Sequence, residues 1–509
     1  MIKRTLSIVL AVFLMLSIVA CSGPETSETN SSNSSFGSDS DYGILNNGEP
    51  IELSIDFGGL LPSVNETPTA ENPTVFRSSQ YIADEFTKMY PNVTIKWEYA
   101  KGSLGDWCLW MTTQLAADSA PDIAFLHGAT YAEKGWYIDL DAWLAEPNIF
   151  VEGNDCWKDM FPDYLWSSYM TSDANGKIVA IPCLIYPGSA TAYYYNKEIF
   201  AEVGVEPPED WEEFIEISKK INDAGYIAVG PAMQNKTVCV DNWDIQFSLG
   251  PTYAAAIQSQ WDYNGDSVMS PNELLRASYE GVFSASKNPA VLDIYQQVKR
   301  KYTEVLEKGA ANTDYETLWS EGKVAMMEDG LWRLPVENSN TSRGFEFGLF
   351  PAPVANSQTS QYAADIEYTT GPYQPPVEVS FNVIKSTVER KGSEEAAIRF
   401  LQWITKPENL NQMVLEKHGE AIGAVKGTVI PPELEEWFQG KFPKLPNAQW
   451  VTGPTEESGN LMSRYLELWI GGYYSDEKFI EQYDKAFKQG IQNQIDGLGV
   501  DVSEWTKWK

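Results

Sequence analysis

An acidic loop at 262–273 carries the most specific chemical pattern of the 509-residue chain. It reads Asp262-Tyr-Asn264-Gly-Asp266-Ser-Val268-Met-Ser270-Pro-Asn-Glu273. This spacing is typical of an EF-hand loop, which gives Ca²⁺ about six to eight oxygen ligands, including the Val268 carbonyl and both Glu273 carboxylate oxygens. It therefore predicts one structural Ca²⁺, although Ser267 replaces the usual turn glycine. The alternative is a solvated acidic turn at a helix start.

No pattern in the sequence marks a catalytic centre. His127 and His418 stand in unrelated contexts, and the motifs of zinc proteases, serine hydrolases and phosphate-binding loops are missing. With 71 acidic residues, the number of carboxylates alone does not exclude a catalytic pair for glycoside hydrolysis, but no spacing in the sequence marks such a pair. We therefore expect that the protein is not an enzyme.

The first cysteine, Cys21, stands at the end of an apolar segment. Lys3 and Arg4 precede an almost unbroken apolar run over 6–20, which predicts a cleaved secretory signal. The run ends Ile18-Val-Ala-Cys21 and resembles a bacterial lipobox, in which the cysteine is acylated, for example with palmitate. Residues 22–48, rich in Ser, Asn, Gly and acid, predict a disordered tether. We expect a lipid anchor at Cys21; the alternative is an ordinary signal with a chance cysteine.

The other four cysteines fit no metal or redox motif. Cys108, Cys156, Cys183 and Cys239 have neither zinc nor thioredoxin-type spacing. One disulfide in an oxidising compartment and four buried thiols both agree with this spacing.

Charge and length exclude several classes of protein. A formal net charge of −34 repels nucleic acid and anionic lipid headgroups, so neither is an expected partner. The chain after the signal is too long for one hydrophobic core, which predicts two domains, and no later stretch is apolar enough to span a membrane. Its 18 Trp, 26 Tyr and 21 Phe exceed what such cores usually require.

Strands and helices alternate through the first part of the chain. Period-2 patterns predict strands at 51–57 and 93–99, and a short apolar run predicts a third at 122–126. Helices are predicted around 81–89 and 111–117 between them. This order indicates parallel βαβ units, whose ligands bind beyond the strand carboxyl ends. Gly59 and His127 lie at those positions. Further strands are predicted at 178–183 and 191–195.

Three later helices are predicted from caps and buried stripes. Asp210 and Glu213 form a capping box before one helix. Ser393 caps a second helix, which stops before Pro407. A third has the apolar stripe Phe479, Tyr483, Phe487 and Ile491.

Four groups of segments, in chain order, resemble the family 1 extracellular solute-binding proteins, which include maltose-binding protein. The first group is Phe86-Thr-Lys-Met-Tyr-Pro-Asn-Val-Thr-Ile95 with Ala120-Pro-Asp-Ile-Ala-Phe125 and Gly135-Trp-Tyr-Ile-Asp-Leu140. The second is Gly176-Lys-Ile-Val-Ala-Ile-Pro182 with Tyr194-Tyr-Asn-Lys-Glu-Ile-Phe200 and 207–214. The third is Leu318-Trp-Ser-Glu-Gly-Lys-Val-Ala-Met-Met327 with Asp329-Gly-Leu-Trp332, and the fourth is 393–407. Insertions near 60–75, 235–290 and 353–376 lengthen this chain relative to compact members.

The resemblance implies a two-lobed α/β fold of the type II periplasmic-binding-protein class, with discontinuous lobes that hinge shut on a ligand. After a signal peptide (1–20) and a lipidated tether (21–48), we expect lobe I at 49–187 plus 377–419 and lobe II at 188–376 plus 420–509. The hinge strands are expected near 187–189, 376–380 and 420.

The resemblance also implies which residues contact ligand. In the family, the aromatic residue after the glycine of the third segment stacks on a sugar ring, which assigns this role to Trp332. Tyr186 follows the strand where the family places a ligand-facing residue. His127 and Gly59 are further candidates, and Trp243 is taken from the aromatic-rich insertion. Each aromatic has the alternative of an ordinary core residue.

These features together predict a lipid-anchored sugar-binding subunit of an ABC importer, on the cell surface or in the periplasm. The expected partners are an oligosaccharide and the permease subunits, and the protein is expected to be a monomer. Some alginate-oligosaccharide-binding members of the family carry a comparable structural calcium. The alternatives are an all-helical glycan-docking lipoprotein of the outer membrane and a secreted glycoside hydrolase.

Overall fold

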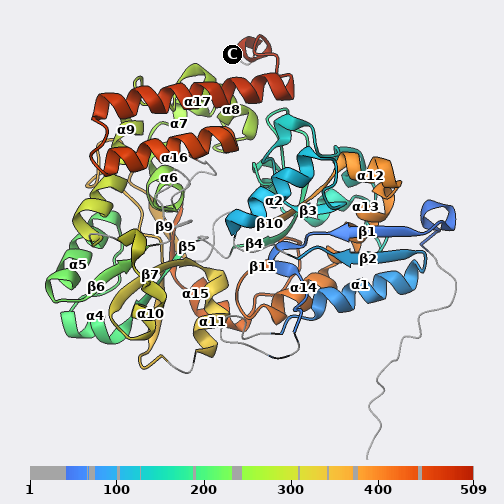
Figure 1. Ribbon diagram of the computed structural model, residues 1–509, viewed down its shortest axis with the longest axis horizontal. Helices are drawn as coiled ribbons and strands as arrows, with labels where there is room; N and C mark the ends of the chain where they lie inside the picture. Colours follow the sequence, from blue (N-terminus) through green and yellow to red (C-terminus); the bar gives the residue numbers. More distant parts are fainter. Residues whose placement is uncertain are drawn as a thin grey trace, which may run out of the picture. The chain divides into compact units, whose positions relative to one another are not determined.

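The computed structural model describes residues 42–65, 67, 75–99, 104–126, 128–186, 191–231, 243–307, 310–340, 343–370, 377–444 and 450–507 (Figure 1). Two larger sheets and one two-stranded sheet organise them. The first sheet has six strands in the order β11-β4-β10-β3-β1-β2. These are β1 (Ile51–Ile55), β2 (Val93–Trp97), β3 (Ile123–Phe125), β4 (Ala180–Ile185), β10 (Val377–Val383) and β11 (Ile422–Gly423). The strands predicted near 51–57, 93–99 and 122–126 are therefore confirmed.

Strand direction changes across this sheet. β1 pairs in parallel with β2 and β3, as the βαβ pattern predicted. β10, which comes much later in the chain, inserts between β3 and β4 and is antiparallel to both. A strand from late in the chain therefore joins β3 to β4 inside the sheet. It lies beside Ala180–Ile185, after which the chain continues towards the second sheet.

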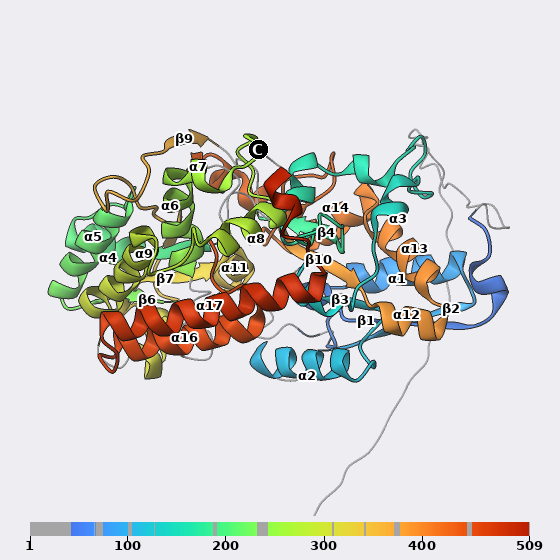
Figure 2. The same cartoon turned by 90° about the horizontal axis from the view of Figure 1, so that it is seen from above.

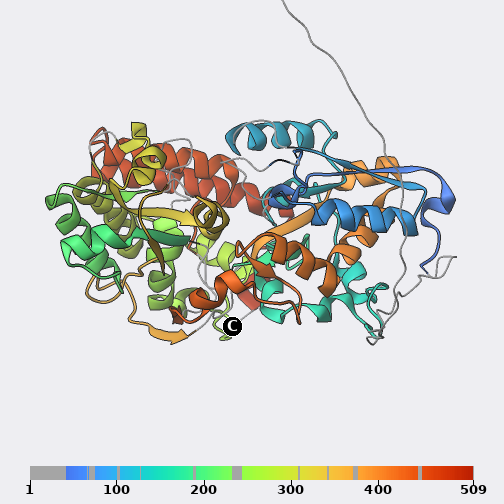
Figure 3. The ribbon, with the colours of Figure 1, turned by 90° about the horizontal axis from the view of Figure 1, so that it is seen from below.

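Helices cover both faces of the first sheet. α1 (Ser78–Met89), α13 (Glu394–Ile404) and α14 (Pro407–Glu416) bury Ile82, Phe86 and Phe400 with the strands in one core. On the other face, α2 (Leu104–Ala116) places Met111 and Leu115 in a second, smaller core. Figure 3 shows α2 on one side of β1 and β2 and α1 on the other. The short helices α3 (Asp141–Ala145) and α12 (Lys385–Lys391) complete this part.

Two predicted helix caps differ in detail. Ser393 precedes α13, but its hydroxyl donates to the carboxylate of buried Asp122 instead of accepting from the helix amides. Asp210 does accept from the Glu213 amide (3.0 Å), as expected. Glu213, however, accepts from the Glu209 amide (2.8 Å), so the reciprocal half of the box is shifted by one residue.

The second sheet has the order β6-β7-β5-β8. Its strands are β5 (Thr191–Asn196), β6 (Ile227–Gly230), β7 (Val324–Gly330) and β8 (Phe347–Pro351), and β9 (Glu367–Thr370) pairs with β12 (Lys441–Lys444) separately. Around it lie α4 (Lys197–Val203), α5 (Trp211–Asp223), α6 (Gly250–Ala256), α7 (Gln258–Trp261), α8 (Pro271–Glu280), α9 (Pro289–Arg300), α10 (Tyr315–Ser320), α11 (Leu334–Ser339), α15 (Glu435–Phe438), α16 (Glu456–Ile470) and α17 (Asp476–Leu498). This sheet and these helices share one core.

The long helix α17 buries the predicted stripe Phe479, Tyr483, Phe487 and Ile491 in that core. It lies beside α16 (Figure 2). Its far end meets the segment before β4: the Asn175 side-chain amide donates to the Leu498 carbonyl (2.9 Å). A Cβ on Gly497 would lie only 2.3 Å from the Glu133 carbonyl oxygen, so a glycine is required for this close approach.

The mixed α/β class predicted from the sequence is confirmed by these sheets and their helices. Of the expected hinge segments, 187–189 and residue 376 lie outside the described ranges, whereas 377–380 form the start of β10. Ala421, Ala424 and Val425 pack in the core of the first sheet, although the expected boundary placed them in lobe II. Among the described residues, no helix is both long and apolar enough to cross a membrane.

Candidate functional site

Trp332 lies at the end of the central strand β7 of the second sheet. The strand stops at Gly330 and continues into a 3₁₀ turn, Leu331–Arg333. A Cβ on Gly330 would come within 2.2 Å of the Trp332 ring, so the ring lies directly against the glycine backbone. The Tyr194 hydroxyl donates to the Gly330 carbonyl (2.9 Å) and fixes the backbone at this point. The Gly-Leu-Trp spacing therefore presents an indole that is 38% exposed.

Three aromatic side chains form a row centred on Trp332. The Tyr186 ring, just after β4, lies 6.1 Å from the Trp332 ring, and the Trp243 ring lies 5.3 Å from it in an edge-on arrangement. These residues come from the end of the first sheet, the end of β7 and the start of the helical turn 244–249. The structure thus brings together three residues that the sequence analysis had named separately.

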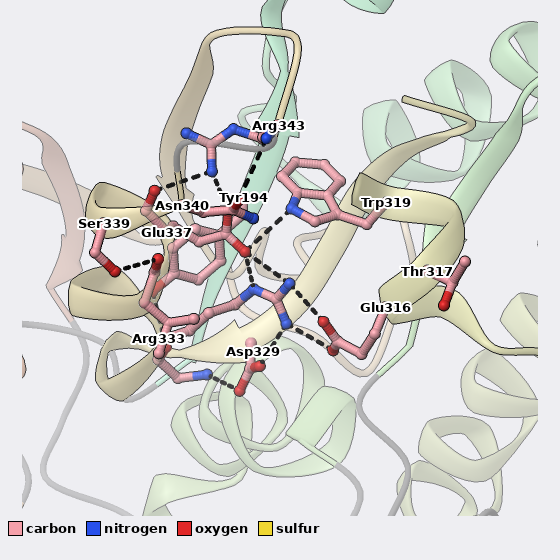
Figure 4. Close-up of polar contacts among 12 residues, drawn as sticks. Tyr194, Glu316, Thr317, Trp319, Asp329, Arg333, Glu337, Ser339, Asn340 and Arg343 are labelled. Atoms are coloured by element: carbon pink, nitrogen blue, oxygen red, sulfur yellow. Dashed lines mark hydrogen bonds and ion pairs between the residues drawn. The ribbon is translucent and has the colours of Figure 1, made fainter. Parts of the chain in front are cut away.

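An ion network centred on the buried Arg333 side chain holds the turn that carries Trp332 (Figure 4). The Arg333 guanidinium donates two bonds to the Glu316 carboxylate (2.7 and 2.9 Å) and one each to Asp329 (3.2 Å) and Glu337 (2.8 Å). Glu337 also accepts from the Trp319 indole (3.1 Å). Arg333 is 8% exposed and Glu337 is 2% exposed, so the bond between them is largely desolvated, whereas the Glu316 side chain is 67% exposed. The charge-assisted bonds together fix the turn.

A second buried network lies behind the aromatic row. The Lys301 ammonium donates to Asp244 (2.7 and 2.8 Å) and to Glu328 (2.9 Å), and none of the three side chains is more than 2% exposed. Asp244 directly follows Trp243, and Glu328 precedes Asp329 on β7. Lys301 therefore connects the two backbone segments that carry Trp243 and Trp332.

Carboxylates gather around Tyr186. Burial, and then the negative charges of Glu378, Glu420 and Asp329, raise the pKa of the Tyr186 phenol well above its usual value. Burial also raises the pKa of Asp329, although Arg333 opposes this effect. The tyrosine hydroxyl therefore stays neutral and remains a hydrogen-bond donor at any physiological pH.

Gly59 lies close to Glu420, one of the carboxylates that act on Tyr186. A Cβ on Gly59 would lie 3.7 Å from the Glu420 carboxylate and 4.0 Å from the Lys417 ammonium. Lys417 pairs with Glu420 at 3.0 Å. The loop after β1 and the segment before β11 therefore meet beside Tyr186. An aromatic row with neighbouring carboxylates suits a ligand with an apolar face and a polar edge.

The predicted calcium loop lies between α7 and α8. Asp262 accepts from the Gly265 amide (2.7 Å), Asn264 from the Asp266 amide (2.9 Å) and Asp266 from the Val268 amide (2.8 Å). Ser267 has φ 63°, so it adopts the left-handed conformation that glycine usually supplies in such loops.

The last predicted ligand is engaged elsewhere. Glu273 accepts from the Tyr263 amide (3.0 Å) and from the amide and hydroxyl of Ser270 (3.1 and 2.8 Å) in a capping box. In the described part of the chain, no group of three or more His, Cys, Asp or Glu side chains is arranged to hold a metal ion. Ca²⁺ binding requires Glu273 to exchange these bonds, and it stays a prediction.

Several named residues lie outside the described ranges. They include His127 and Cys21, the predicted site of the lipid anchor. Cys156 and Cys183 carry free thiols, and burial raises the pKa of the Cys183 thiol above its usual range. Cys239 is outside the described residues, and the side chain of Cys108 is not described.

Sequence reasoning missed the charged part of the site. Glu378, Lys417, Glu420 and Arg333 were not named as candidates. A signal did exist for Glu378: the segment Val377-Glu-Val-Ser-Phe-Asn-Val383 alternates apolar and polar residues, the pattern of a strand with one polar face.

Comparison with known proteins identifies the family. Residues 70–410 match the bacterial extracellular solute-binding proteins. A relative from Brucella abortus (strain 2308), named as a binding protein, is 27% identical over 222 residues, which are 43% of this chain and 46% of that relative. A relative from Brucella suis biovar 1 (strain 1330) matches to the same extent. The match therefore spans less than half the length of these curated relatives.

Solved structures share the fold at low identity. A family 1 extracellular solute-binding protein from Bifidobacterium longum subsp. infantis has a TM-score of 0.53 at 17% identity, covering 88% of this chain and 100% of that one. A chitin oligosaccharide binding protein gives 0.58 at 16% identity (87% and 99%), and the GacH receptor of Streptomyces glaucescens GLA.O gives 0.54 at 17% (87% and 98%). The fold is thus the two-lobed binding-protein type, and the chain belongs to the bacterial extracellular solute-binding proteins.

Proposed function

We propose that the protein is the carbohydrate-capturing lipoprotein of an ABC importer, with an oligosaccharide as its ligand. The observation that carries this proposal is the row of Tyr186, Trp332 and Trp243, with Trp332 38% exposed beside a group of carboxylates. A pyranose ring presents C–H groups on one face, which pack on an indole, and hydroxyls on its edge, which bond to carboxylates.

The relatives support the same class of ligand. The names of two structural neighbours refer to chitin oligosaccharide and to acarbose, and a third neighbour was solved with maltose. An all-helical docking lipoprotein does not agree with the sheets described above. A glycoside hydrolase is disfavoured because the family consists of binding proteins.

Capture is proposed to occur by hinge closure between two lobes around the aromatic row. An acylated Cys21 and the tether at 22–48 are proposed to hold the protein at the membrane, on the cell surface or in the periplasm, where it delivers ligand to the permease as a monomer. The net charge of −34 excludes nucleic acid as a partner on electrostatic grounds.

The proposal is tested by screening soluble oligosaccharides for a rise in melting temperature, since a ligand that binds only the folded state stabilises it. Calorimetry with the best ligand then compares wild type with Trp332→Ala. We expect a loss of about 1–3 kcal/mol, roughly 5- to 150-fold in affinity, for a lost aromatic contact.

The control for this variant is Tyr473→Ala, which removes an aromatic side chain that is 81% exposed and is expected to leave affinity unchanged. Equal affinity of wild type and Trp332→Ala would show that the aromatic row is not the ligand platform. A screen in which no carbohydrate stabilises the protein would contradict the proposed function itself.

A further inference from the structure

Strand β10 has two different faces, although both are buried. Val377, Val379, Phe381 and Val383 pack in the core of the first sheet. The intervening residues Glu378, Ser380 and Asn382 are polar and are 8%, 0% and 0% exposed. Polar groups are placed in such an interior only where they have partners to bind.

The polar face of β10 is short of partners. The Glu378 Oε2, Ser380 Oγ and Asn382 Oδ1 atoms are buried and accept or donate no hydrogen bond within the described structure. Asn382 uses only its amide nitrogen, which donates to the Gly128 and Val179 carbonyls (2.9 and 2.8 Å). Three consecutive orphan groups on one strand face are costly unless something else satisfies them.

A local irregularity in the pairing of β10 with β4 lies beside the outermost of these groups. Val377 pairs with Ile185, Val379 with Leu184 and Ser380 with Pro182, so the register shifts at Val379 and returns to its first alignment one residue later. Glu378 lies at this irregularity, and it is close enough to Tyr186, which follows Ile185, for its charge to raise the pKa of the phenol.

The surroundings of Glu378 leave it without a cationic partner. Lys417, whose charge acts on Glu378, pairs with Glu420 at 3.0 Å. Burial, together with the negative charge of Glu420, raises the pKa of Glu378 well above its usual value, and Lys417 opposes this only in part. This shift favours the protonated carboxyl, which offers one donor and one acceptor side by side.

We infer that Glu378 forms a hydrogen-bonding subsite for the ring hydroxyls of an uncharged sugar whose face stacks on Tyr186 and Trp332. Neighbouring sugar hydroxyls each donate and accept, which complements the paired donor and acceptor of the carboxyl. The subsite favours neutral sugars over amino sugars. This inference rests on the proposed function, and it adds the recognition of the sugar edge to the recognition of its face.

The test uses the full mature protein and the neutral oligosaccharide that gives the largest thermal shift. Glu378→Gln keeps a donor and an acceptor, so its affinity is expected to stay within about threefold of wild type. Glu378→Met keeps the size of the side chain but no strong hydrogen bond, so its affinity is expected to fall roughly tenfold or more. Glu367→Gln, whose side chain is 82% exposed, is the control and should bind as wild type does.

Two outcomes would overturn the inference while the proposed function stands. The first is that Glu378→Met binds the neutral oligosaccharide with full affinity although Trp332→Ala has lost affinity for it. The second is that wild type binds the corresponding amino sugar more tightly than the neutral sugar. If wild type binds no sugar at all, the proposed function fails and the subsite fails with it. Melting curves of both Glu378 variants confirm folding, and the Gln variant keeps the comparison valid if the Met variant does not fold.

Discussion

Asp56 is a buried acid whose ionisation is expected to make stability depend on pH. It follows β1, is 1% exposed, and accepts from the Trp107 indole (2.8 Å) and the Gly58 amide (3.2 Å). Burial raises the pKa of Asp56 from 3.8 to about 6, because these two bonds compensate only part of the desolvation. Asp56 therefore supports the Gly58–Leu60 turn at the edge of the candidate site, but its ionisation lowers the free energy of unfolding.

The sign of the effect follows from proton linkage. The folded state holds the Asp56 proton more tightly than the unfolded state, so falling pH stabilises the fold, beginning near the folded pKa of about 6 and complete below the unfolded value of 3.8. The full difference is about 3 kcal/mol at roughly 1.4 kcal/mol for each unit of pKa. Between pH 7 and pH 5 the gain is about 1.3 kcal/mol.

The assay compares the unfolding free energies of wild type and Asp56→Asn in urea at pH 7 and pH 5. Asparagine cannot ionise and still accepts from Trp107, so wild type should gain about 1.3 kcal/mol on the variant as the pH falls. Asp159→Asn, at an exposed site, is the matched control and should follow wild type at both values. A difference between wild type and Asp56→Asn that does not change with pH would refute the reasoning.

Three further predictions concern residues elsewhere in the chain. Lys301→Met leaves two buried carboxylates without a counter-charge and should cost about 3–5 kcal/mol in chemical denaturation. Lys220→Met, at an exposed ion pair with Glu216, should cost under about 1 kcal/mol; equal losses would contradict this. Cys21→Ser should be released from the membrane or left unprocessed, and unchanged partitioning into detergent would count against the anchor. EDTA should lower the melting temperature if the 262–273 loop holds Ca²⁺, since a metal at a hundredfold excess over its Kd stabilises the fold by about 2.7 kcal/mol. Asp262→Ala should abolish this sensitivity to EDTA. An unchanged melting curve, with no calcium found by elemental analysis, would show that the loop is an ordinary acidic turn.

Local patterns were sufficient to predict much of the fold. The strands near 51–57 and 93–99 and the stripe from Phe479 to Ile491 follow from periodicity, because each element buries one face. The antiparallel insertion of β10 between β3 and β4 is a long-range pairing, which no local window contains. The shifted bond of Glu213 and the Asp122 contact of Ser393 likewise depend on tertiary neighbours.

The candidate site shows the same division. The aromatic candidates Trp332, Tyr186 and Trp243 were predicted, the first two from the resemblance, and they lie together in the structure. Their charged neighbours Arg333 and Glu378 were not predicted, because they stand out from other charged residues only by their burial, which the sequence does not show. A lone acid among 71 acidic residues is unremarkable in sequence, and it becomes informative only when the structure shows that it is enclosed and unpaired.

The end of α17 has a mechanical consequence. The helix is fixed along its length in the core of the second sheet, and its last turn contacts Glu133 and Asn175. The helix is a stiff rod, so its end holds these two residues at a fixed distance from that core. Any side chain introduced at Gly497 would have to push the Glu133 backbone away, so the contact exists only with a glycine at this position.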